Sequence, residues 1–524
     1  MPSYTSKKLA FNNLEQFKES FSEPSPTIGY IYIGNALPYA NESSPDSITD
    51  TVANEKSVWD NMLAAKRITG NDVEIVVPRV YWSGNTKYRQ YDDTIEESVL
   101  VSANTTQNLK PMYVITSGRS VYKCLSNNSS ANSTVEPSGD YTTSNGNIAT
   151  SDGYIWKYLY NVSSSNRFLT TNWMPAPSST AALDYNVNDT GVVDGELTSI
   201  IVTANGTNYT DVSNVRVNGF SSGQTSLRLS NTALTLALFN ISTLANLSNL
   251  VISGTGIPAD SYISSISNTT GVITLSAATN NYGGNANNIT VGTRIYVFGD
   301  GTGVAANATI SNTQITKTTV TTIGTGYTKA NVFIYGSGSG ASARAILPPA
   351  LGHAYNPAKE LCANSVMVTT RIGEIDTTEG GLISSNTSFR QFGFLRDPYK
   401  YGSTSKANTS AANSVISQTT NMTVVAGTNY VLGEFVYQGT ASNPSASGYV
   451  NSQTTNALNL SNVTGTFNVG LPLKGLSSGA SRTVITIKNP EFAKYRGDIL
   501  YAENAVATTR TDGQAENIKL VISF

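Results

Sequence analysis

Charged residues are scarce in this sequence. Only 13% of its 524 residues are Asp, Glu, Lys or Arg, whereas a soluble domain typically has about 25%. The formal net charge is −2, so the chain lacks the positive field with which proteins neutralise nucleic-acid phosphates. We therefore expect no nucleic-acid partner.

Long hydrophobic runs are missing as well. A helix needs about 18 consecutive apolar residues to cross a membrane, and no run in the sequence approaches that length. The first residues lack the apolar segment of a secretory signal. These absences predict a protein that is made in a cytoplasm and has no membrane anchor.

Histidine and cysteine are almost absent. Because nucleophilic triads and most zinc sites use histidine, any such site would have to include His353, and no second ligand with metal-like spacing lies beside it. We expect His353 to be structural, in a loop before a short helix that Asn356 caps and Pro357 begins. Cys124 and Cys362 are expected to be separate thiols, with a disulfide between them left open.

Two further segments were weighed as chemical sites. The densest acidic group is Asp92, Asp93, Glu96 and Glu97, but it lacks the alternating pattern of a calcium loop, so we expect a solvated turn. Residues 336–341 are glycine-rich, but no Lys-Ser/Thr pair follows them, which indicates a β-turn and not a phosphate loop. We expect no catalytic, cofactor-binding or metal-binding residues, and no enzymatic activity.

The abundant residues favour a β protein. Ser, Thr and Asn together make up about one residue in three, and 43 glycines accompany them, a composition that favours turns and strands over long helices. The 28 Tyr, 15 Phe and 4 Trp residues supply enough apolar surface for a folded core. We therefore expect a folded, mainly β chain.

Helical periodicity occurs in two segments, residues 6–21 and about 50–67. Asp50 or Thr49 is expected to cap the second helix, and Gly70 to end it. The apolar faces consist of Ala10, Leu14, Phe17 and Phe21 in the first and of Val58, Trp59, Met62 and Leu63 in the second. Short apolar runs predict strands at residues 28–34, 73–78, 112–115, 154–160 and 517–524.

Internal repeats divide the rest of the chain. Residues 203–219 return as residues 321–336, each with a Gly-Thr-Asn/Gly-Tyr-Thr turn, and the spacing is too long for a solenoid. Residues 433–448 are echoed by residues 470–480, as a small barrel would require at its corners. Short strands around residues 250–276 suggest a small β-domain nested in the first repeat.

These patterns predict five segments. A parent domain spans residues 1–189, continues through residues 348–402 and ends with strands in residues 488–524. Residues 190–347 form one inserted β-module with the nested domain, and residues 403–487 form a second, barrel-like module. All four tryptophans lie within the first 173 residues, so we expect one N-terminal core.

Several segments of the parent domain resemble the baseplate wedge protein of T-even-type contractile-tailed bacteriophages, the product of their gene eight. The resemblance is carried, in matching order, by residues 31–34 with Pro38 and Tyr39, 77–79 with Trp82 and Tyr88, 121–125, 153–159, 389–391, 497–504 and 516–524. The inserted modules are not covered by it.

The resemblance implies a β-sandwich with a few helices in its loops, acting as a homodimer beside other baseplate wedge proteins. It implies a structural role in the tail baseplate of a virion, assembled from protein made in the host bacterial cytoplasm, and it carries over no catalytic residues. The alternative is a tail adhesin whose inserted β-modules bind a host receptor or surface glycan. A depolymerase using the acidic residues is the third class considered.

Overall fold

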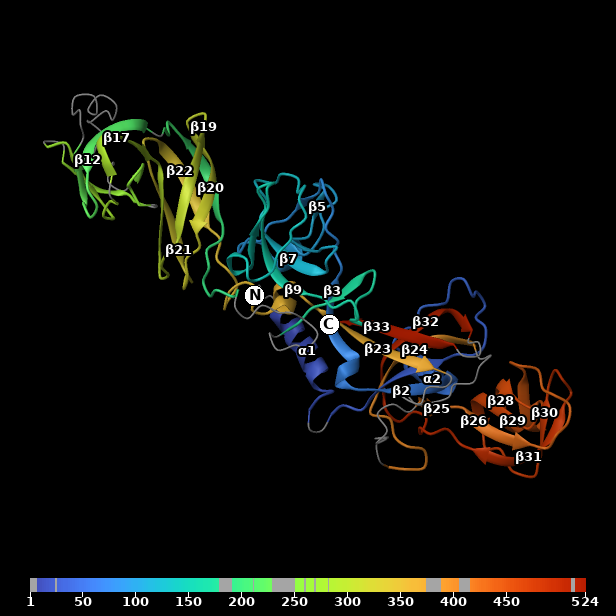
Figure 1. The fold of residues 1–524 in the computed structure, drawn as a ribbon. Helices are drawn as coiled ribbons and strands as arrows, with labels where there is room; N and C mark the ends of the chain where they lie inside the picture. Colours follow the sequence, from blue (N-terminus) through green and yellow to red (C-terminus); the bar gives the residue numbers. More distant parts are fainter. Residues whose placement is uncertain are drawn as a thin grey trace, which may run out of the picture. The chain divides into compact units, whose positions relative to one another are not determined.

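The computed structural model (Figure 1) describes residues 7–23, 26–178, 191–210, 212–228, 250–258, 261–267, 270–280, 282–373, 388–404, 415–509 and 514–524. The fold is mainly β, built from antiparallel sheets with a few short helices, as expected. None of the helices in the described ranges is long and apolar enough to span a membrane.

Contacts group the chain into two compact units. Unit 1 comprises Met1–Val77, Arg167–Ala176 and Ala363–Phe524, and unit 2 comprises Pro78–Asn166 and Pro177–Cys362. The four tryptophans do not share one core as we expected, because Trp59 and Trp173 belong to unit 1 while Trp82 and Trp156 belong to unit 2. The five-segment division remains a prediction.

Unit 1 contains two antiparallel sheets. The first has the order β25 (Val415–Ser417), β2 (Met62–Ile68), β1 (Gly29–Gly34), β24 (Ser388–Arg396) and β32 (Asp498–Thr509). The second has the order β10 (Trp173–Pro175), β3 (Val73–Pro78), β23 (Ser365–Gly373) and β33 (Ala515–Ser523).

The two sheets of unit 1 form a sandwich. Every residue of β1 and β2 is buried, so both faces of these strands are covered. Lys66 of β2 donates a hydrogen bond to the carbonyl of Arg371 in β23 at 2.6 Å. Helix α1 (Lys7–Glu19) lies against both sheets, since the Phe17 ring is 5.9 Å from that of Phe394 and 5.3 Å from that of Phe524.

The second predicted helix is shorter than expected. Helix α2 (Val52–Asn61) is capped by Thr51 and not by Asp50 or Thr49 as expected, because the Thr51 side chain accepts from the Asn54 amide. The prediction was wrong beyond residue 61, where the chain continues as β2 and pairs with β1 and β25. Strand pairing with burial on both faces outweighs helical periodicity there. Val58 and Trp59 lie in the core with Tyr30 and Tyr32, on the expected face.

The barrel expected from the second repeat is present in unit 1. Its six strands close in the order β26 (Thr420–Val424), β29 (Ala457–Gly465), β28 (Asn443–Gln453), β27 (Phe435–Thr440), β30 (Pro472–Gly475) and β31 (Ser481–Lys488). An apolar core of its own fills it. The Glu434 carboxylate holds one corner, because it accepts from the backbone amides of Val431, Ser477 and Ser478 at 2.7–2.9 Å.

Unit 2 begins with a four-stranded sheet. Its order is β6 (Tyr113–Ile115), β7 (Ser120–Ser126), β9 (Ile155–Asn161) and β8 (Asn147–Ala149). Tyr88, Tyr122, Tyr154 and Trp156 dominate the core beside it. Around it lie the short pair β4 (Lys87–Tyr88) and β5 (Leu109–Lys110), the helices α3 (Glu97–Leu100) and α5 (Pro357–Glu360), and the single turn η2 (Ser144–Gly146).

The first repeat builds the next part of unit 2. Strand β11 (Ile200–Thr207) pairs with β22 (Ser339–Ala345), and a second sheet has the order β20 (Gln314–Thr322), β19 (Ala305–Ser311), β18 (Arg294–Gly299) and β21 (Ala330–Tyr335). The nested part has two sheets, with the orders β12 (Val212–Phe220), β17 (Tyr282–Gly292), β14 (Val251–Ser253) and β13 (Ser226–Arg228), β16 (Val272–Leu275), β15 (Ile263–Ser267).

The two copies of the repeat are alike in packing. Tyr209 and Tyr327, the equivalent tyrosines, are both buried. Each ring lies directly on glycines: a Cβ at Gly338 would come within 2.5 Å of the Tyr209 ring, and one at Gly301 within 2.5 Å of the Tyr327 ring. The glycine content of these segments therefore has a steric cause.

Candidate functional site

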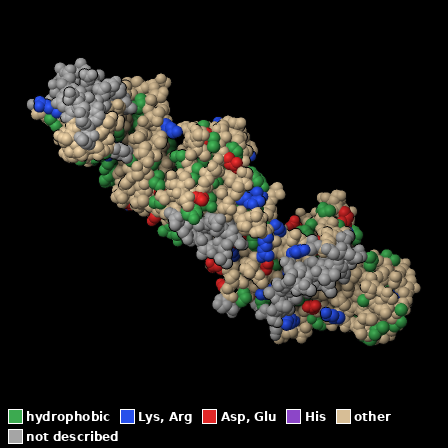
Figure 2. Space-filling model, viewed as in Figure 1, with side chains coloured by type: hydrophobic (Ala, Val, Ile, Leu, Met, Phe, Trp, Pro, Cys, Tyr) green, Lys and Arg blue, Asp and Glu red, His purple; other side chains and the backbone are tan. Residues whose placement is uncertain are grey.

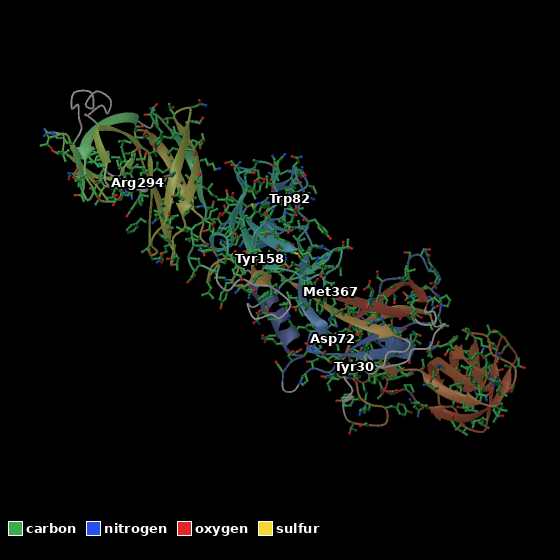
Figure 3. All side chains as sticks on the ribbon, viewed as in Figure 1. Tyr30, Asp72, Trp82, Tyr158, Arg294 and Met367 are labelled. Atoms are coloured by element: carbon green, nitrogen blue, oxygen red, sulfur yellow. The ribbon has the colours of Figure 1, made fainter. Side chains whose placement is uncertain are left out.

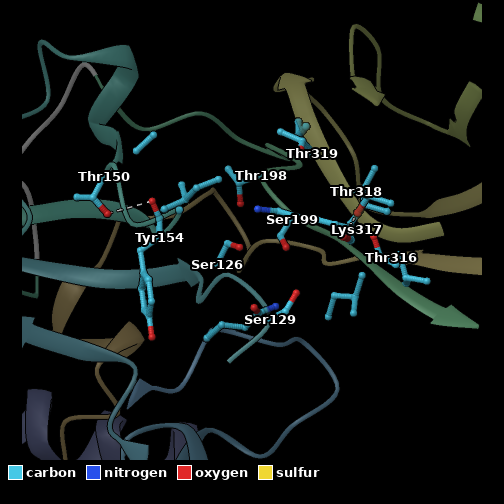
Figure 4. A pocket seen from close by; sticks show the side chains of 18 residues that line it. Ser126, Ser129, Thr150, Tyr154, Thr198, Ser199, Thr316, Lys317, Thr318 and Thr319 are labelled. Atoms are coloured by element: carbon cyan, nitrogen blue, oxygen red, sulfur yellow. Dashed lines mark hydrogen bonds between the residues drawn. The ribbon is translucent and has the colours of Figure 1, made fainter. Parts of the chain in front are cut away.

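Half of the residues that line a pocket of about 310 Å³ in unit 2 carry a hydroxyl group (Figure 4). Ser126, Thr150 and Tyr154 border it from the β7–β9 side, and Ser199 and Thr318 from β11, β20 and the segment before them. Among the described residues that line it, there is no histidine, cysteine or carboxylate. The pocket can therefore offer hydrogen bonds to a polar ligand but holds no acid–base pair for catalysis.

Lys317 is the one charged residue that lines this pocket. Its ammonium group donates to Asn128 Oδ1 at 2.9 Å. Thr318 Oγ1 donates to the carbonyl of Ile200. These bonds tie two polar groups of the pocket wall to the surrounding backbone and side chains. The fold therefore holds this part of the wall in place.

Unit 1 has a pocket of about 460 Å³ between the start of α2 and β32. Asp50, Glu55 and Asp498 line it, and Asp498 pairs with Arg396 at 2.7 Å. Within the described part of the chain, no group of three or more His, Cys, Asp and Glu residues is placed to hold a metal ion.

His353 lies in the expected loop, but it is fully buried within a charged cluster. Its Nδ1 is 3.1 Å from Lys123 Nζ and 3.4 Å from Glu360 Oε2, and the Tyr91 ring packs edge-on against it at 4.9 Å. Burial, reinforced by the Lys123 cation, lowers the pKa of His353 to about 3. A neutral imidazole whose Nδ1 accepts from Lys123 suits a packing role better than that of a general base.

The carboxylate of Glu360 holds this cluster together. Burial alone would raise the pKa of Glu360, but the Lys123 cation at 2.9 Å lowers it to about 2. Glu360 also accepts from the Ala354 amide at 2.6 Å. The short helix α5 that carries it is capped by Asn356, as expected, through a bond from the Lys359 amide.

A second buried ion pair joins Lys157 of β9 to Glu196 at 2.8 Å, and neither side chain is exposed. Sequence analysis missed both buried lysines. Their position in the sequence could have indicated their burial. Lys123 and Lys157 each follow an aromatic residue and interrupt a strand that is otherwise mostly apolar. Buried charges of this kind need partners, so each lysine implied a carboxylate elsewhere in the chain.

The predicted acidic turn is present: Asp93 is exposed as expected, Asp92 is half-buried, and both are paired with an arginine. Arg344 of β22 bonds both oxygens of Asp92 at 2.8 Å and reaches Asp93 at 2.5 Å. Burial opposes ionisation of Asp92, but bonds from Thr94 and Arg344 hold its pKa below the usual range. The structure does not bring Glu96 or Glu97 to this ion pair, and both are exposed.

The two cysteines and the glycine-rich segment have structural positions in unit 2. No disulfide joins Cys124 and Cys362: Cys124 is buried, and Cys362 is half-buried with its thiol 3.8 Å from a Glu97 oxygen. Residues 336–338 form the turn that leads into β22, and Ser337 Oγ accepts from the Thr210 amide.

Among the exposed apolar side chains of the described residues, two groups lie on neighbouring segments or strands. We call Val425, Val469, Leu471 and Ile485 the barrel patch; they are 47–59% exposed. Backbone bonds join their segments, from Val425 to Thr483 and from Val484 to Leu471. Figure 2 shows apolar side chains on the surface of the barrel.

The second surface is an aromatic strip on β18 and β21, formed by Tyr296, Phe298 and Phe333. Tyr296 and Phe333 are cross-strand partners, and Phe298 follows on the same face. Beside them the Arg294 guanidinium lies 3.4 Å from the Tyr262 ring centre and 5.0 Å from that of Tyr296 (Figure 3). Exposed apolar groups of this kind mark contact surfaces.

No family model matches the sequence, and no curated protein is significantly similar to it.

Proposed function

We propose that the chain is a structural component of a phage tail baseplate wedge. In this role it makes the protein–protein contacts that assemble the baseplate and transmit its rearrangement when the tail contracts. Its partners are a second copy of itself and other wedge proteins. The proposal rests first on the ordered resemblance of the N- and C-terminal segments to that family.

About half of the residues that carry the resemblance are buried core residues, which is compatible with a shared fold. Ile31, Tyr32 and Ile33 are fully buried, and so are Tyr154 and Trp156. Buried residues indicate the fold, but they do not identify the partners that a protein binds. A contact role has to be supported by residues on the surface.

The barrel patch is the observation that carries the contact role. Its four aliphatic residues would gain the free energy of burial if a neighbour covered them, and interface cores are similarly depleted of charge. The 13% charge of the chain fits a surface that is covered in an assembly. The hydroxyl-lined pocket and the neutral His353 offer no catalytic group that competes with this interpretation.

The test is association of the full-length protein, measured by sedimentation and by mixing with purified wedge proteins of the same tail. We expect a dimer that binds at least one wedge protein. Val469→Glu and Ile485→Glu should weaken that binding at least tenfold, since a buried unpaired carboxylate costs several kcal/mol. Ser442→Glu, at an exposed position of the β27–β28 turn, is the matched control and should leave binding intact. A strict monomer that binds no wedge protein would refute the proposal.

The aromatic strip favours a second candidate, a tail adhesin for host surface glycans. Aromatic faces combined with a polar handle suit half-apolar ligands such as sugar rings, and the strip lies in the segment expected to be an inserted module. Tyr296→Ala and Phe298→Ala should then abolish binding to host polysaccharide while leaving wedge assembly unchanged. Glycan binding that survives both substitutions would exclude this surface.

A further inference from the structure

A lysine, an asparagine and a glutamate meet inside unit 2. Lys157 of β9 and Asn147 of β8 are direct cross-strand partners, so their side chains leave the sheet on the same face with Cβ atoms about 5 Å apart. The Glu196 carboxylate bridges them. Its Oε1 accepts from Lys157 Nζ at 2.8 Å, and its Oε2 accepts from Asn147 Nδ2 at 3.2 Å. The amine and the amide thus share the two oxygens of one carboxylate.

Two of the three side chains are completely buried. The side chains of Lys157 and Glu196 have no exposed surface. The side-chain oxygen of Asn147 is also buried, and it has no hydrogen-bond partner among the residues that the structure describes. Buried polar atoms almost always have one. An unsatisfied amide oxygen next to a buried amine and a buried carboxyl group therefore calls for a chemical explanation.

We propose that Lys157 and Asn147 form an intramolecular isopeptide bond, with Glu196 as the group that moves the protons. Lys157 Nζ attacks Asn147 Cγ, the new Cγ–Nζ bond forms, the Cγ–Nδ2 bond breaks, and ammonia leaves. Of the three ammonium hydrogens, one ends on Glu196, one moves through Glu196 to the departing nitrogen, and one stays on the new amide. The reaction is an amide exchange and requires no oxidant, reductant or activated group.

Each step has a physical basis in the fold. Burial raises the pKa of Glu196, although Lys157 opposes this, and so favours the neutral form of this carboxyl group beside the Lys157 side chain. A desolvated amine is a strong nucleophile. If the side-chain amide of Asn147 flips, so that its oxygen and nitrogen exchange places, the unsatisfied oxygen accepts a hydrogen bond from protonated Glu196. This bond polarises Cγ for attack. Two reacting groups that the fold holds next to each other react as if they were present at very high concentration. Asn147 is itself half-buried, which gives ammonia a way out.

The competing state is an ordinary buried ion pair. Lys157 Nζ also donates to the carbonyls of Asn145 at 3.0 Å and Gly191 at 2.9 Å, so all three ammonium hydrogens have acceptors. The other buried lysine provides a comparison within the same unit, since the side chains that Lys123 contacts by hydrogen bonding are a carboxylate and an imidazole. The two states of Lys157 differ in covalent mass, which makes them separable.

The decisive measurement is the intact mass of the purified, denatured full-length protein. We expect it to be about 17 Da below the mass calculated from the sequence, because one ammonia is lost. Lys157→Ala, Asn147→Ala and Glu196→Ala should each return to their own calculated mass. The control Asn161→Ala, which removes another amide of β9 that bonds Gly118 and Ser120, should keep the deficit. The calculated mass in the wild-type protein would overturn the proposal without any variant.

Peptide mapping locates the bond and separates it from other losses of ammonia. Cleavage before aspartate gives residues 140–151, which contain Asn147, and residues 152–183, which contain Lys157. We expect these two peptides to stay joined after denaturation and reduction. Asn147→Asp should form the same product with loss of water, about 18 Da. A deficit confined to a single unjoined peptide, as from a succinimide at asparagine, would also refute the cross-link.

Discussion

At the scale of single residues, two ion pairs of this charge-poor chain lie in the interior of unit 2. Lys123, Lys157, Glu196 and Glu360 are all buried within unit 2, although charged residues are scarce. Replacement of such pairs by apolar residues is often neutral, whereas loss of one partner is costly. Each buried charge therefore selects the pairing of particular segments, here β7 with α5 and β9 with the segment that precedes β11.

His353 predicts a specific acid sensitivity. Its folded pKa of about 3 lies below the ordinary value of 6.5, so between these values the unfolded chain binds a proton that the folded chain does not. Stability from this residue is therefore present above pH 6.5 and declines as the pH falls towards 3. Glu360, with a folded pKa of about 2 against 4.5, adds a loss in the same direction at lower pH.

His353→Gln should remove the first of these losses, because its side chain keeps an acceptor for Lys123 but does not titrate. Between pH 7 and pH 5 the wild-type protein should lose about 2 kcal/mol more unfolding free energy than the variant. Urea unfolding at the two pH values, followed by tryptophan fluorescence, measures the difference. Equal pH dependence in the two proteins would show that His353 is not held neutral.

At the scale of elements, the sequence predicted structure well wherever local pattern and tertiary context agree. The periodicity of residues 6–21 became α1, and the apolar runs became β1, β3, β6 and β9. The helix prediction was wrong at Met62–Ile68 because Met62 and Leu63 continue the apolar face of the helix. The pairing of this segment with β1 and β25 depends on tertiary structure, which the local pattern does not contain. For the same reason Arg344 could not be assigned to Asp92 across 252 positions.

The closed barrel supplies a prediction at this scale. Glu434→Ala leaves three backbone amides, those of Val431, Ser477 and Ser478, without their acceptor. Hydrogen bonds to charged groups contribute about 1.5–3 kcal/mol each, so we expect about 3 kcal/mol of destabilisation after water has compensated part of the loss at these partly exposed amides. Glu434→Gln keeps one oxygen and should lose less.

Chemical unfolding of the two Glu434 variants beside the wild-type protein tests this account of the barrel corner. Hydrogen exchange at residues 477–478 gives a local readout that a general loss of stability would not reproduce. Faster exchange there in Glu434→Ala, with Glu434→Gln intermediate, is the expected order. Unchanged exchange would mean that the carboxylate does not hold these turns.

At the scale of the whole molecule, composition and contacts divide the chain differently. Composition joined residues 78–166 to the N-terminal segment because tryptophans and apolar strands continue there. Contacts place them with residues 177–362. The ion pairs Lys123–Glu360 and Arg344–Asp92 are part of the reason, since they tie residues 78–166 to the end of the repeat-bearing stretch. Because the two residues of each ion pair are far apart in the sequence, the local composition of the chain does not reveal that they pair.

The two units therefore predict separable unfolding, because each has a core of its own. Leu395 of β24 and Leu159 of β9 are matched probes, fully buried in unit 1 and unit 2 respectively. Each Leu→Ala change should cost about 2–5 kcal/mol. In calorimetry of the full chain, Leu395→Ala should lower one transition and Leu159→Ala another, while the remaining transition stays in place. If both variants shifted one common transition by the same amount, the units would unfold as a single cooperative body, and the division of the chain at residues 77–78 and 362–363 would have no thermodynamic meaning.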